Sequence, residues 1–326
     1  MIRPAETPDR APGPAPGPAP GPAPGPAPGQ TPDWIAVDWG TTHLRAWAMG
    51  PAGPLAEAAS GDGMGSLAPE GFEPALLRLI GPWLGGPAEV VACGMVGSRQ
   101  GWAEAPYRAV PCTPLGPPLA HAPARDPRLR VRLVPGLKQL RPPDVMRGEE
   151  TQIAGFLSTR PGFDGVLCLP GTHSKWVHLS AGEVVSFSTC MTGELFALLS
   201  EASVLRHSLT DGWDEAAFAE AVSEALSRPE RLAGALFGLR AAGLLGQSTG
   251  GAARARLSGL LIGAELAATR PYWLGQPVAL VGAERLSGFY AAALAAQGVT
   301  AERADARTMT LAGLAAARTL TVETAP

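Results

Sequence analysis

Cysteine is scarce in this chain, and its few cysteines follow no disulfide or metal-binding pattern. Cys93, Cys112, Cys168 and Cys190 form no CxxC pair, and no histidine stands near them at metal-ligand spacing. Cys93 and Cys168 lie within apolar runs that predict strands, where a reduced, buried thiol is expected. The sequence therefore implies no disulfide framework.

Long apolar runs and a strong net charge are also missing. No stretch reaches membrane-spanning length, and the N-terminus lacks the basic-then-apolar order of a signal peptide. The formal net charge is only −3, which gives no reason to expect nucleic acid or an anionic membrane as a partner. We therefore expect a cytoplasmic protein whose partner is a small molecule, held by local donors.

Several common catalytic motifs are absent. The chain has no GxxxxGK[ST] sequence, no GxGxxG after a predicted strand and no HExxH, and its five histidines form no recognisable metal set. These absences exclude a P-loop kinase and remove the main signals of a dinucleotide-binding domain or a zinc protease.

The chain begins with a repetitive segment. Residues 11–29 repeat Gly-Pro-Ala-Pro with a period of four, which excludes collagen and favours extended polyproline II. We predict that residues 1–32 form a disordered arm without catalytic function, a docking role being the alternative. The remaining length suits two domains, predicted at 33–160 and 161–326.

The two halves share a predicted order of elements. In the first half, strands are expected at 34–37, 44–49, 54–59, 89–93 and 131–134, and helices at 72–84 and from 149. In the second half, strands are expected at 166–169, 175–179, 183–188, 278–282 and 299–302, and helices from 192, within 215–270, at 286–296 and from 308. The repetition predicts two similar α/β domains that face each other across a cleft.

The turn after the first strand carries phosphate-binding chemistry. It reads Asp38-Trp39-Gly40-Thr41-Thr42, so backbone amides at a glycine are joined by two hydroxyls. Asp38 stands at the strand end, where its carboxylate is suited to a hydrated Mg²⁺. The alternative is an ordinary hairpin turn with polar residues.

An equivalent turn follows the first strand of the second half. Gly171 and Thr172 begin the run Gly-Thr-His-Ser-Lys, and Lys175 is one of only two lysines in the chain. Lys175 is a candidate for neutralising phosphate, with a solvated lysine at a strand end as the alternative. Two such turns in matching positions favour a polyphosphate site over two ordinary hairpins.

A helix predicted to start near residue 149 begins with two glutamates. Acidic residues in a first turn complement the helix dipole, which explains one of them without a function. The functional interpretation makes Glu149 a general base for a substrate hydroxyl. Arg147, just before it, is suited to a bidentate contact with a substrate carboxylate.

Two further segments offer polar groups. Ser98, Arg99 and Gln100 follow a strand of the first half and are candidates for binding a polyhydroxylated acid, unless they belong to a plain surface loop. Thr192 stands at a predicted helix start, either as the capping residue or with its hydroxyl in the cleft.

Taken together, the segments DWGTT, GMVGSRQGW, DVMRGEETQ, PGTHSKW, MTGEL and LSGLLIGAE resemble the 2-dehydro-3-deoxygalactonokinase family. This family is a branch of the actin/hexokinase/Hsp70-like superfamily. The resemblance implies two ribonuclease-H-like domains, each βββαβα, that close over ATP and Mg²⁺. It also implies transfer of the γ-phosphoryl group to the 6-hydroxyl of 2-dehydro-3-deoxy-D-galactonate, in galactose or galactonate breakdown.

Individual roles follow from the same resemblance. DWGTT and PGTHSKW match the two phosphate motifs of the superfamily, and Gly282 matches the glycine turn near adenosine. Glu149 stands where related sugar kinases carry the aspartate that acts as base. The longer side chain leaves the choice between Glu149 and Glu150 open.

Other functions remain compatible with the sequence. The same chemistry on the gluconate epimer is one, because no residue pattern separates epimers at a single carbon. A non-catalytic nucleotide-binding sensor of the same fold is the other. The oligomeric state is not predicted.

Overall fold

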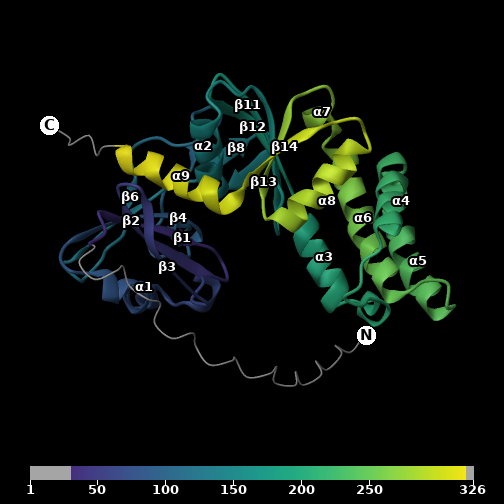
Figure 1. Ribbon diagram of the computed structural model, residues 1–326, viewed down its shortest axis with the longest axis horizontal. Coiled ribbons are helices and arrows are strands. Elements are labelled where there is room, and N and C mark those ends of the chain that lie inside the picture. The colour runs from purple at the N-terminus through teal and green to yellow at the C-terminus, as the bar shows by residue number, and fades with distance from the viewer. Residues whose placement is uncertain (1–30, 321–326) are drawn as a thin grey trace, which may run out of the picture.

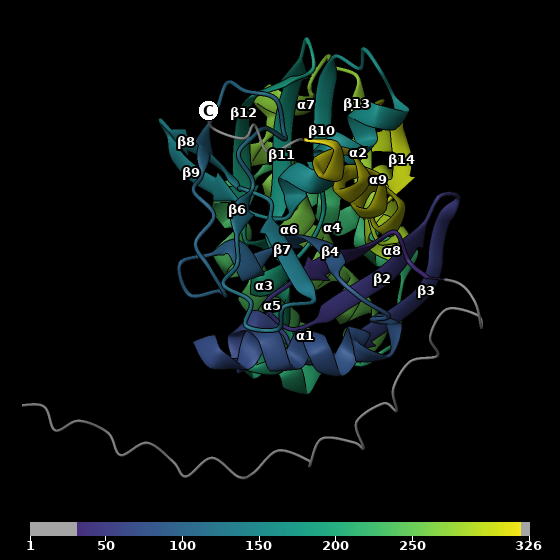
Figure 2. The ribbon, with the colours of Figure 1, turned by 90° about the vertical axis from the view of Figure 1, so that its left-hand side faces the viewer.

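Two mixed β-sheets form the framework of the computed structural model, which describes residues 31–320 (Figures 1 and 2). The predicted arm at 1–32 therefore lies almost wholly outside the described residues. The first sheet has the order β3-β2-β1-β4-β7-β6, built from Gly53–Ser60, Leu44–Gly50, Trp34–Trp39, Ala88–Gly94, Leu129–Leu133 and Ala120–His121. The second has the order β12-β11-β10-β13-β14, built from Glu183–Cys190, Ser174–Ser180, Gly165–Leu169, Val278–Gly282 and Ala301–Asp305.

The two sheets repeat one topology. In each, three consecutive strands form an antiparallel meander, and the first of them pairs in parallel with a later strand. Parallel pairing requires a crossover connection, which α1 (Phe72–Ile80) helps provide in the first half. This order is that of a ribonuclease-H-like domain, so the predicted fold class is confirmed. The domain boundary near residue 160 stays a prediction.

The central strands are buried on both faces. All five residues of β10 (GVLCL) and of β13 (VALVG) are buried. A strand covered on both faces needs a continuous apolar run, and both strands have one. The same pattern made these strands predictable. The helix expected at 72–84 instead ends at Ile80, where a 3₁₀ turn, Gly81–Trp83, begins with proline in its first positions.

Helices fill the connections of the second half. α3 (Thr192–Glu201), α4 (Glu215–Ser227), α5 (Leu232–Leu244), α6 (Gly250–Ala268) and α7 (Arg270–Trp273) lie between β12 and β13. α8 (Glu284–Ala295) joins β13 to β14, and both β10–β13 and β13–β14 pair in parallel. Figure 1 shows this helical group on the side away from the first sheet.

Two helices connect the sheets by crossing each other. α2 (Glu149–Thr159) and α9 (Ala306–Thr319) lie side by side in both views (Figures 1 and 2). α2 buries Ile153 and Phe156 with side chains of the second sheet, whereas α9 buries Leu314 and Ala317 with side chains of the first. Each sheet is thus covered in part by a helix from the other half of the chain.

A small third sheet was not predicted. It has the order β5-β8-β9, built from Arg108–Ala109, Leu137–Leu140 and Pro143–Met146. Strands of two to four residues give too short a pattern for period-two alternation to be recognised. β9 leads through two residues to the start of α2, so this sheet helps to position the residues of the site.

Within residues 31–320, none of the helices combines the length and the apolarity needed to span a bilayer.

Candidate active site

The predicted phosphate turns meet in one cleft. A cavity of about 340 Å³ opens at the carboxyl ends of β1, β4, β10 and β13, the edge where α/β sheets bind ligands. Gly40 lies in its wall from the first half, and Gly171 from the second. The residues that line it are Asp38, Gly40, Thr41, Cys93, Gly94, Met95, Arg147, Gly148, Glu149, Gln152, Leu169, Pro170, Gly171, Thr172, His173, Val281, Gly282, Ala283, Ala306 and Thr310.

The first turn is held by its own backbone and by the chain that follows. The Gly40 N–H donates to the carbonyl of His43 (2.9 Å), which closes the turn between β1 and β2. The carbonyls of Gly40 and Thr41 accept from Met64 and Gly65 (3.0 and 2.9 Å). Thr41 therefore lines the cleft in a fixed turn, whereas Thr42 is exposed and does not line it.

Asp38 is the acidic group of the first turn. Its side chain is 25% exposed, and its Oδ2 lies 3.5 Å from Nη1 of Arg45. Burial raises the pKa of Asp38, and the charge of Arg45 opposes that rise. The described residues include no cluster of three potential metal ligands, but Mg²⁺ is commonly held by one or two carboxylates together with substrate phosphates and water. Asp38 fits that mode of binding.

The second turn is anchored by a network of buried hydrogen bonds at the start of β11. Ser174, just after the turn, contacts the hydroxyl of Tyr290 (2.9 Å), and Tyr290 donates to Glu265 (2.8 Å). Glu265 also accepts from the indole N–H of Trp176 (2.8 Å). These buried contacts fasten β11 to α6 and α8, so Gly171 and Thr172 are presented to the cleft on a rigid base.

The start of α2 approaches the first sheet through two glycines. Gly148 has φ = 108° and Gly94 has φ = 92°, in the left-handed region that side chains disfavour. A Cβ on Gly148 would lie 3.4 Å from the Cα of Gly94. The close approach places the first turn of α2 beside the end of β4.

Two adjacent glutamates at this helix start lie in different surroundings. Glu149 lines the cleft with its side chain 25% exposed, and its Oε2 accepts from the Arg147 N–H (3.0 Å). Glu150 is fully buried and does not line the cleft, and its Oε2 accepts from the Gly148 N–H (2.7 Å). Of the two carboxylates, Glu149 is the one that faces the cleft.

Both carboxyl groups are poised to hold protons more tightly than usual. Burial raises the pKa of Glu149, and Lys175 opposes that rise. Burial, together with the charge of Glu149, raises the pKa of Glu150 to about 8. A carboxylate with a raised pKa in a cleft is suited to accept a proton near neutral pH.

Arg147 is buried, and two of its nitrogen atoms make no hydrogen bond with residues 31–320. Its Nη2 donates to the carbonyl of Ala105 (2.8 Å), and its guanidinium lies 4.3 Å from the ring centroid of Tyr107. Its Nε and Nη1 have no hydrogen-bond partner among residues 31–320, and neither does the buried hydroxyl of Ser98. Buried polar groups in folded proteins are nearly always paired, and Arg147 lines the cleft, so its unpaired donors are available to a ligand there.

The remaining predicted residues do not all line the cleft. Gly282 lines the cleft, whereas Arg99 and Gln100 are exposed and do not line it. Lys175 is buried behind Glu149 and does not line the cleft either. The interpretation of Thr192 as a helix cap is wrong, because Met191 occupies the cap position and the Thr192 side chain contacts Glu265.

A second cavity adjoins the cleft and was not predicted. It measures about 310 Å³ and shares Gly171 and Thr172 with the cleft. Its wall includes Trp213 and Phe289, whose rings stack at 4.2 Å, together with Arg285. The aromatic residues lie far apart in the sequence, which is why this cavity was not predicted. Of the predicted site residues, Gly171 and Thr172 line it, whereas Gly282 lines the cleft instead.

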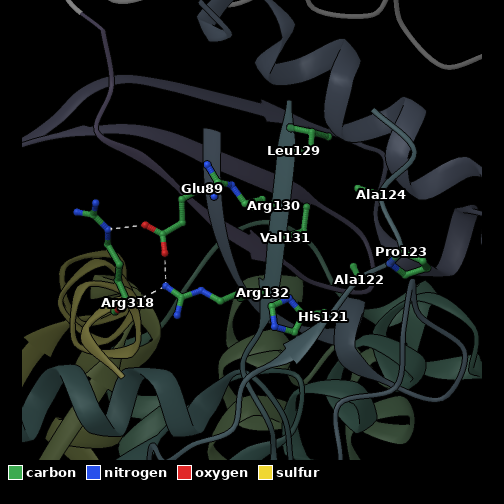
Figure 3. A pocket seen from close by; sticks show the side chains of 10 residues that line it. All are labelled: Glu89, His121, Ala122, Pro123, Ala124, Leu129, Arg130, Val131, Arg132 and Arg318. Atoms are coloured by element: carbon green, nitrogen blue, oxygen red, sulfur yellow. Dashed lines mark hydrogen bonds and ion pairs between the residues drawn. The ribbon is translucent and has the colours of Figure 1, made fainter. Parts of the chain in front are cut away.

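A larger cavity of about 700 Å³ lies elsewhere, beside β4, β6 and β7 (Figure 3). Two of its three arginines are already engaged, since Arg132 and Arg318 both pair with Glu89. None of the predicted site residues lines it. The cleft between the two turns is therefore the better candidate for the active site.

Known proteins match the chain over nearly its whole described length. A Rhizobium meliloti (strain 1021) protein, described as a probable 2-dehydro-3-deoxygalactonokinase and named DgoK1, is 40% identical over 297 residues, covering 86% of this chain and 95% of its own. The 2-dehydro-3-deoxygalactonokinase of Escherichia coli (strain K12) is 35% identical over 283 residues, covering 84% and 94%.

A solved structure agrees with the sequence matches. It comes from Sinorhizobium meliloti, is itself described as a candidate 2-dehydro-3-deoxygalactonokinase, and superposes with a TM-score of 0.81 at 39% identity. The superposition covers 87% of this chain and 97% of that one. The sequence pattern of the 2-keto-3-deoxy-galactonokinase family matches residues 38–317, from the first phosphate turn to the last described helix. The chain therefore belongs to the 2-keto-3-deoxy-galactonokinase family.

Proposed function

We propose that this protein transfers the γ-phosphoryl group of ATP to the 6-hydroxyl of 2-dehydro-3-deoxy-D-galactonate, in galactose or galactonate catabolism. The observation that carries the proposal is the convergence of Gly40, Gly171 and Glu149 on one cleft. Two backbone turns are suited to a triphosphate, and a carboxylate beside them is suited to a hydroxyl acceptor. The family membership supports the same reaction and substrate.

The nucleotide spans the two adjoining cavities in this proposal. Its adenine occupies the aromatic cavity beside Trp213 and Phe289, where a flat base gains stacking and apolar contact. Its phosphates extend past Gly171 and Thr172, which both cavities share, toward Gly40. Gly282, predicted to lie near the adenosine, lines the cleft and not the aromatic cavity.

Mg²⁺ accompanies the nucleotide, held by Asp38 through its carboxylate or through bound water. When bound, the cation neutralises charge on the phosphate oxygens. The raised pKa of Asp38 reflects burial that a bound cation would offset, which is consistent with this role.

The substrate carboxylate pairs with Arg147. Its Nη1 has no partner among residues 31–320, and Nη2 makes one hydrogen bond, so the Nη1/Nη2 edge can form the end-on bidentate contact that guanidinium groups make with carboxylates. The Ser98 hydroxyl, which does not line the cleft and has no partner within residues 31–320, remains a predicted donor from the loop after β4. Arg99 and Gln100 remain predicted contacts from the same loop.

Glu149 is the proposed general base. It accepts the proton of the 6-hydroxyl as that oxygen forms a bond to the γ-phosphorus, and the bond from the γ-phosphorus to the departing ADP oxygen breaks. The turns at Gly40 and Gly171 hold the triphosphate in line with the acceptor through their N–H groups. Closing the cleft excludes water, which limits hydrolysis of ATP.

A coupled ADP-release assay tests the proposal. We expect turnover with 2-dehydro-3-deoxy-D-galactonate and lower kcat/KM with the gluconate epimer. Glu149→Gln should keep the fold and lose about 10²- to 10⁴-fold in kcat. A preference for the gluconate epimer would overturn the substrate assignment, and ATP binding without turnover on either acid would favour a nucleotide-binding sensor. Near-wild-type turnover of Glu149→Gln would remove the base assignment.

A further inference from the structure

The ammonium group of Lys175 makes contacts within the protein that a phosphate-binding lysine would not need. This group donates to the hydroxyl of Thr189 (2.8 Å) and to the carbonyl of Val145 (3.2 Å), and lies 3.8 Å from Oε1 of Glu149. Lys175 itself is buried and does not line the cleft, whereas Glu149 does. Of these three partners, Glu149 is the one that carries charge. The charge of Lys175 is therefore directed at Glu149.

A second group of contacts fixes Thr189, whose hydroxyl accepts from Lys175. Asp144 accepts from the backbone N–H of Thr189 (2.7 Å) and from its hydroxyl (2.7 Å). Because the Thr189 hydroxyl donates its proton to Asp144, its lone pairs are free to accept from Lys175. The chain of contacts from Asp144 to Glu149 thus has a single consistent set of donors and acceptors.

This chain joins four elements that carry different parts of the site. Asp144 and Val145 belong to β9, Thr189 to β12, Lys175 to β11 and Glu149 to the first turn of α2. The same strand β11 leaves the phosphate turn at Gly171. The position of Glu149 is thereby tied to the element that is to hold the triphosphate.

We propose that Lys175 is a positioning residue that, fixed by Thr189 and Val145, holds the Glu149 carboxylate toward the acceptor site. The proposal rests on the proposed function, in which Glu149 is the base. It replaces direct phosphate binding as the role of Lys175. An ammonium group close to a carboxylate also favours its ionised form, which is the form that accepts a proton.

The other charged groups around Glu149 either lower its pKa less than Lys175 does, as His173 does, or do not lower it. His173, from the phosphate turn, is paired with Glu194 (2.6 Å). Arg147 directs its Nη2 at the carbonyl of Ala105, and Glu150 adds negative charge. Asp144 lies beyond Thr189. Lys175 is therefore the group whose loss most raises the pKa of Glu149.

The test is the pH dependence of kcat in Lys175→Met. We expect kcat at pH 7 to fall about tenfold or more, and the acidic limb of the profile to move to higher pH by about one unit. The KM for ATP should stay within about twofold of wild type, since the ammonium group does not reach the nucleotide. Lys138→Met, which changes the other lysine of the chain, is the matched control and should leave both quantities unchanged.

A pair of substitutions at Thr189 covers the case in which Lys175→Met fails to fold. Thr189→Val removes the hydroxyl that holds Lys175, whereas Thr189→Ser keeps it. We expect Thr189→Val to lower kcat and move the acidic limb in the same direction, and Thr189→Ser to restore most of both. These readouts depend on the charge and position of Glu149, which a purely structural role for Lys175 would not move.

Two results would overturn the proposal. A raised KM for ATP with an unmoved acidic limb would make Lys175 a phosphate ligand, and an unchanged profile in both Lys175→Met and Thr189→Val would leave it without a role in catalysis. Glu149→Gln separates these results from a failure of the proposed function. If Glu149→Gln is inactive while Lys175→Met has a wild-type profile, only the positioning role fails; if Glu149→Gln is active, the base assignment itself fails.

Discussion

Glu149 and Glu150 are neighbours in the sequence, yet the fold gives them opposite surroundings. Glu149 is partly exposed in the cleft, whereas Glu150 is fully buried and accepts from the Gly148 N–H. The sequence predicted that a glutamate here acts as base but left the choice between the two open. That choice depends on which way the first turn of α2 faces, and the helix dipole does not determine this direction.

Glu150 provides a prediction on stability. Its pKa of about 8 lies above the ordinary value of 4.5. At pH values between these two, the folded state keeps a proton on Glu150 that the unfolded state releases. The free energy of unfolding should therefore decrease as pH rises from about 5 to 8. Glu150→Gln should flatten this decrease and raise stability at pH 8 by about 1–4 kcal/mol, measured by urea denaturation across that pH range.

The same substitution separates the two glutamates in catalysis. Because Glu150 is largely protonated at pH 7, an amide reproduces its shape and charge, and kcat should stay within about threefold of wild type. Asp38 and Glu265 also have raised pKa values and add to the same pH trend, so the variant is compared with wild type at each pH. A loss of turnover in Glu150→Gln equal to that of Glu149→Gln would contradict the division of roles.

Arg147 provides a prediction on substrate binding. Arg147→Lys keeps the charge but removes the planar fork that pairs with a carboxylate through two hydrogen bonds. We expect the KM for the sugar acid to rise about tenfold or more, with the KM for ATP unchanged, in steady-state kinetics with each substrate varied. Equal effects on both KM values would indicate general damage to the cleft instead.

At the scale of elements, the crossing of α2 and α9 depends on two glycines. A Cβ on Gly155 would lie 1.9 Å from the carbonyl oxygen of Met309, and one on Gly313 would lie 1.9 Å from that of Thr151. The helix backbones therefore touch, and neither position has room for a methyl group. Since α2 carries Glu149 at its start, this contact also helps to fix Glu149 in the wall of the cleft.

Gly313→Ala should lower the free energy of unfolding by about 2–4 kcal/mol, because the added methyl group must push the helices apart. Gly238→Ala is the matched control, since Gly238 lies within α5 and a Cβ there meets open space. It should raise stability by about 0.5–1 kcal/mol through helix propensity. Chemical denaturation of both variants checks the pair, and a similar small change in each would contradict the backbone contact.

The elements differ in how far the sequence predicted them. Strands such as β1, β10 and β13 were predictable because burial on both faces demands continuous apolar runs. β5, β8 and β9 were missed because strands of two to four residues show no period. The contacts of Lys175 with Thr189 and Val145 were also out of reach, because they depend on pairing between strands far apart in the chain.

At the scale of the whole molecule, the site exists only where the two halves meet. Gly40 and Glu149 come from the first half and Gly171 and Gly282 from the second, and all four line the same cleft. The repeat of topology in the sequence predicted such a cleft, and the matching turns predicted what lines it. The aromatic cavity beside it was not predictable, because Trp213 and Phe289 are brought together only by the folded helices.

The proposed domains, 33–160 and 161–326, are expected to close over the substrates. Closure brings the turn at Gly40 toward the turn at Gly171 and removes water from around the triphosphate. The crossing helices α2 and α9 are the packed elements that link the halves, so we expect the movement to preserve their contact.

The most direct test is a crystal structure with a non-hydrolysable ATP analogue and 2-dehydro-3-deoxy-D-galactonate. We expect the triphosphate to contact the backbone at Gly40 and Gly171, and the Glu149 carboxylate to accept a hydrogen bond from the 6-hydroxyl at about 2.6–3.2 Å. A triphosphate bound outside this cleft, or a 6-hydroxyl that faces any group other than Glu149, would contradict the mechanism.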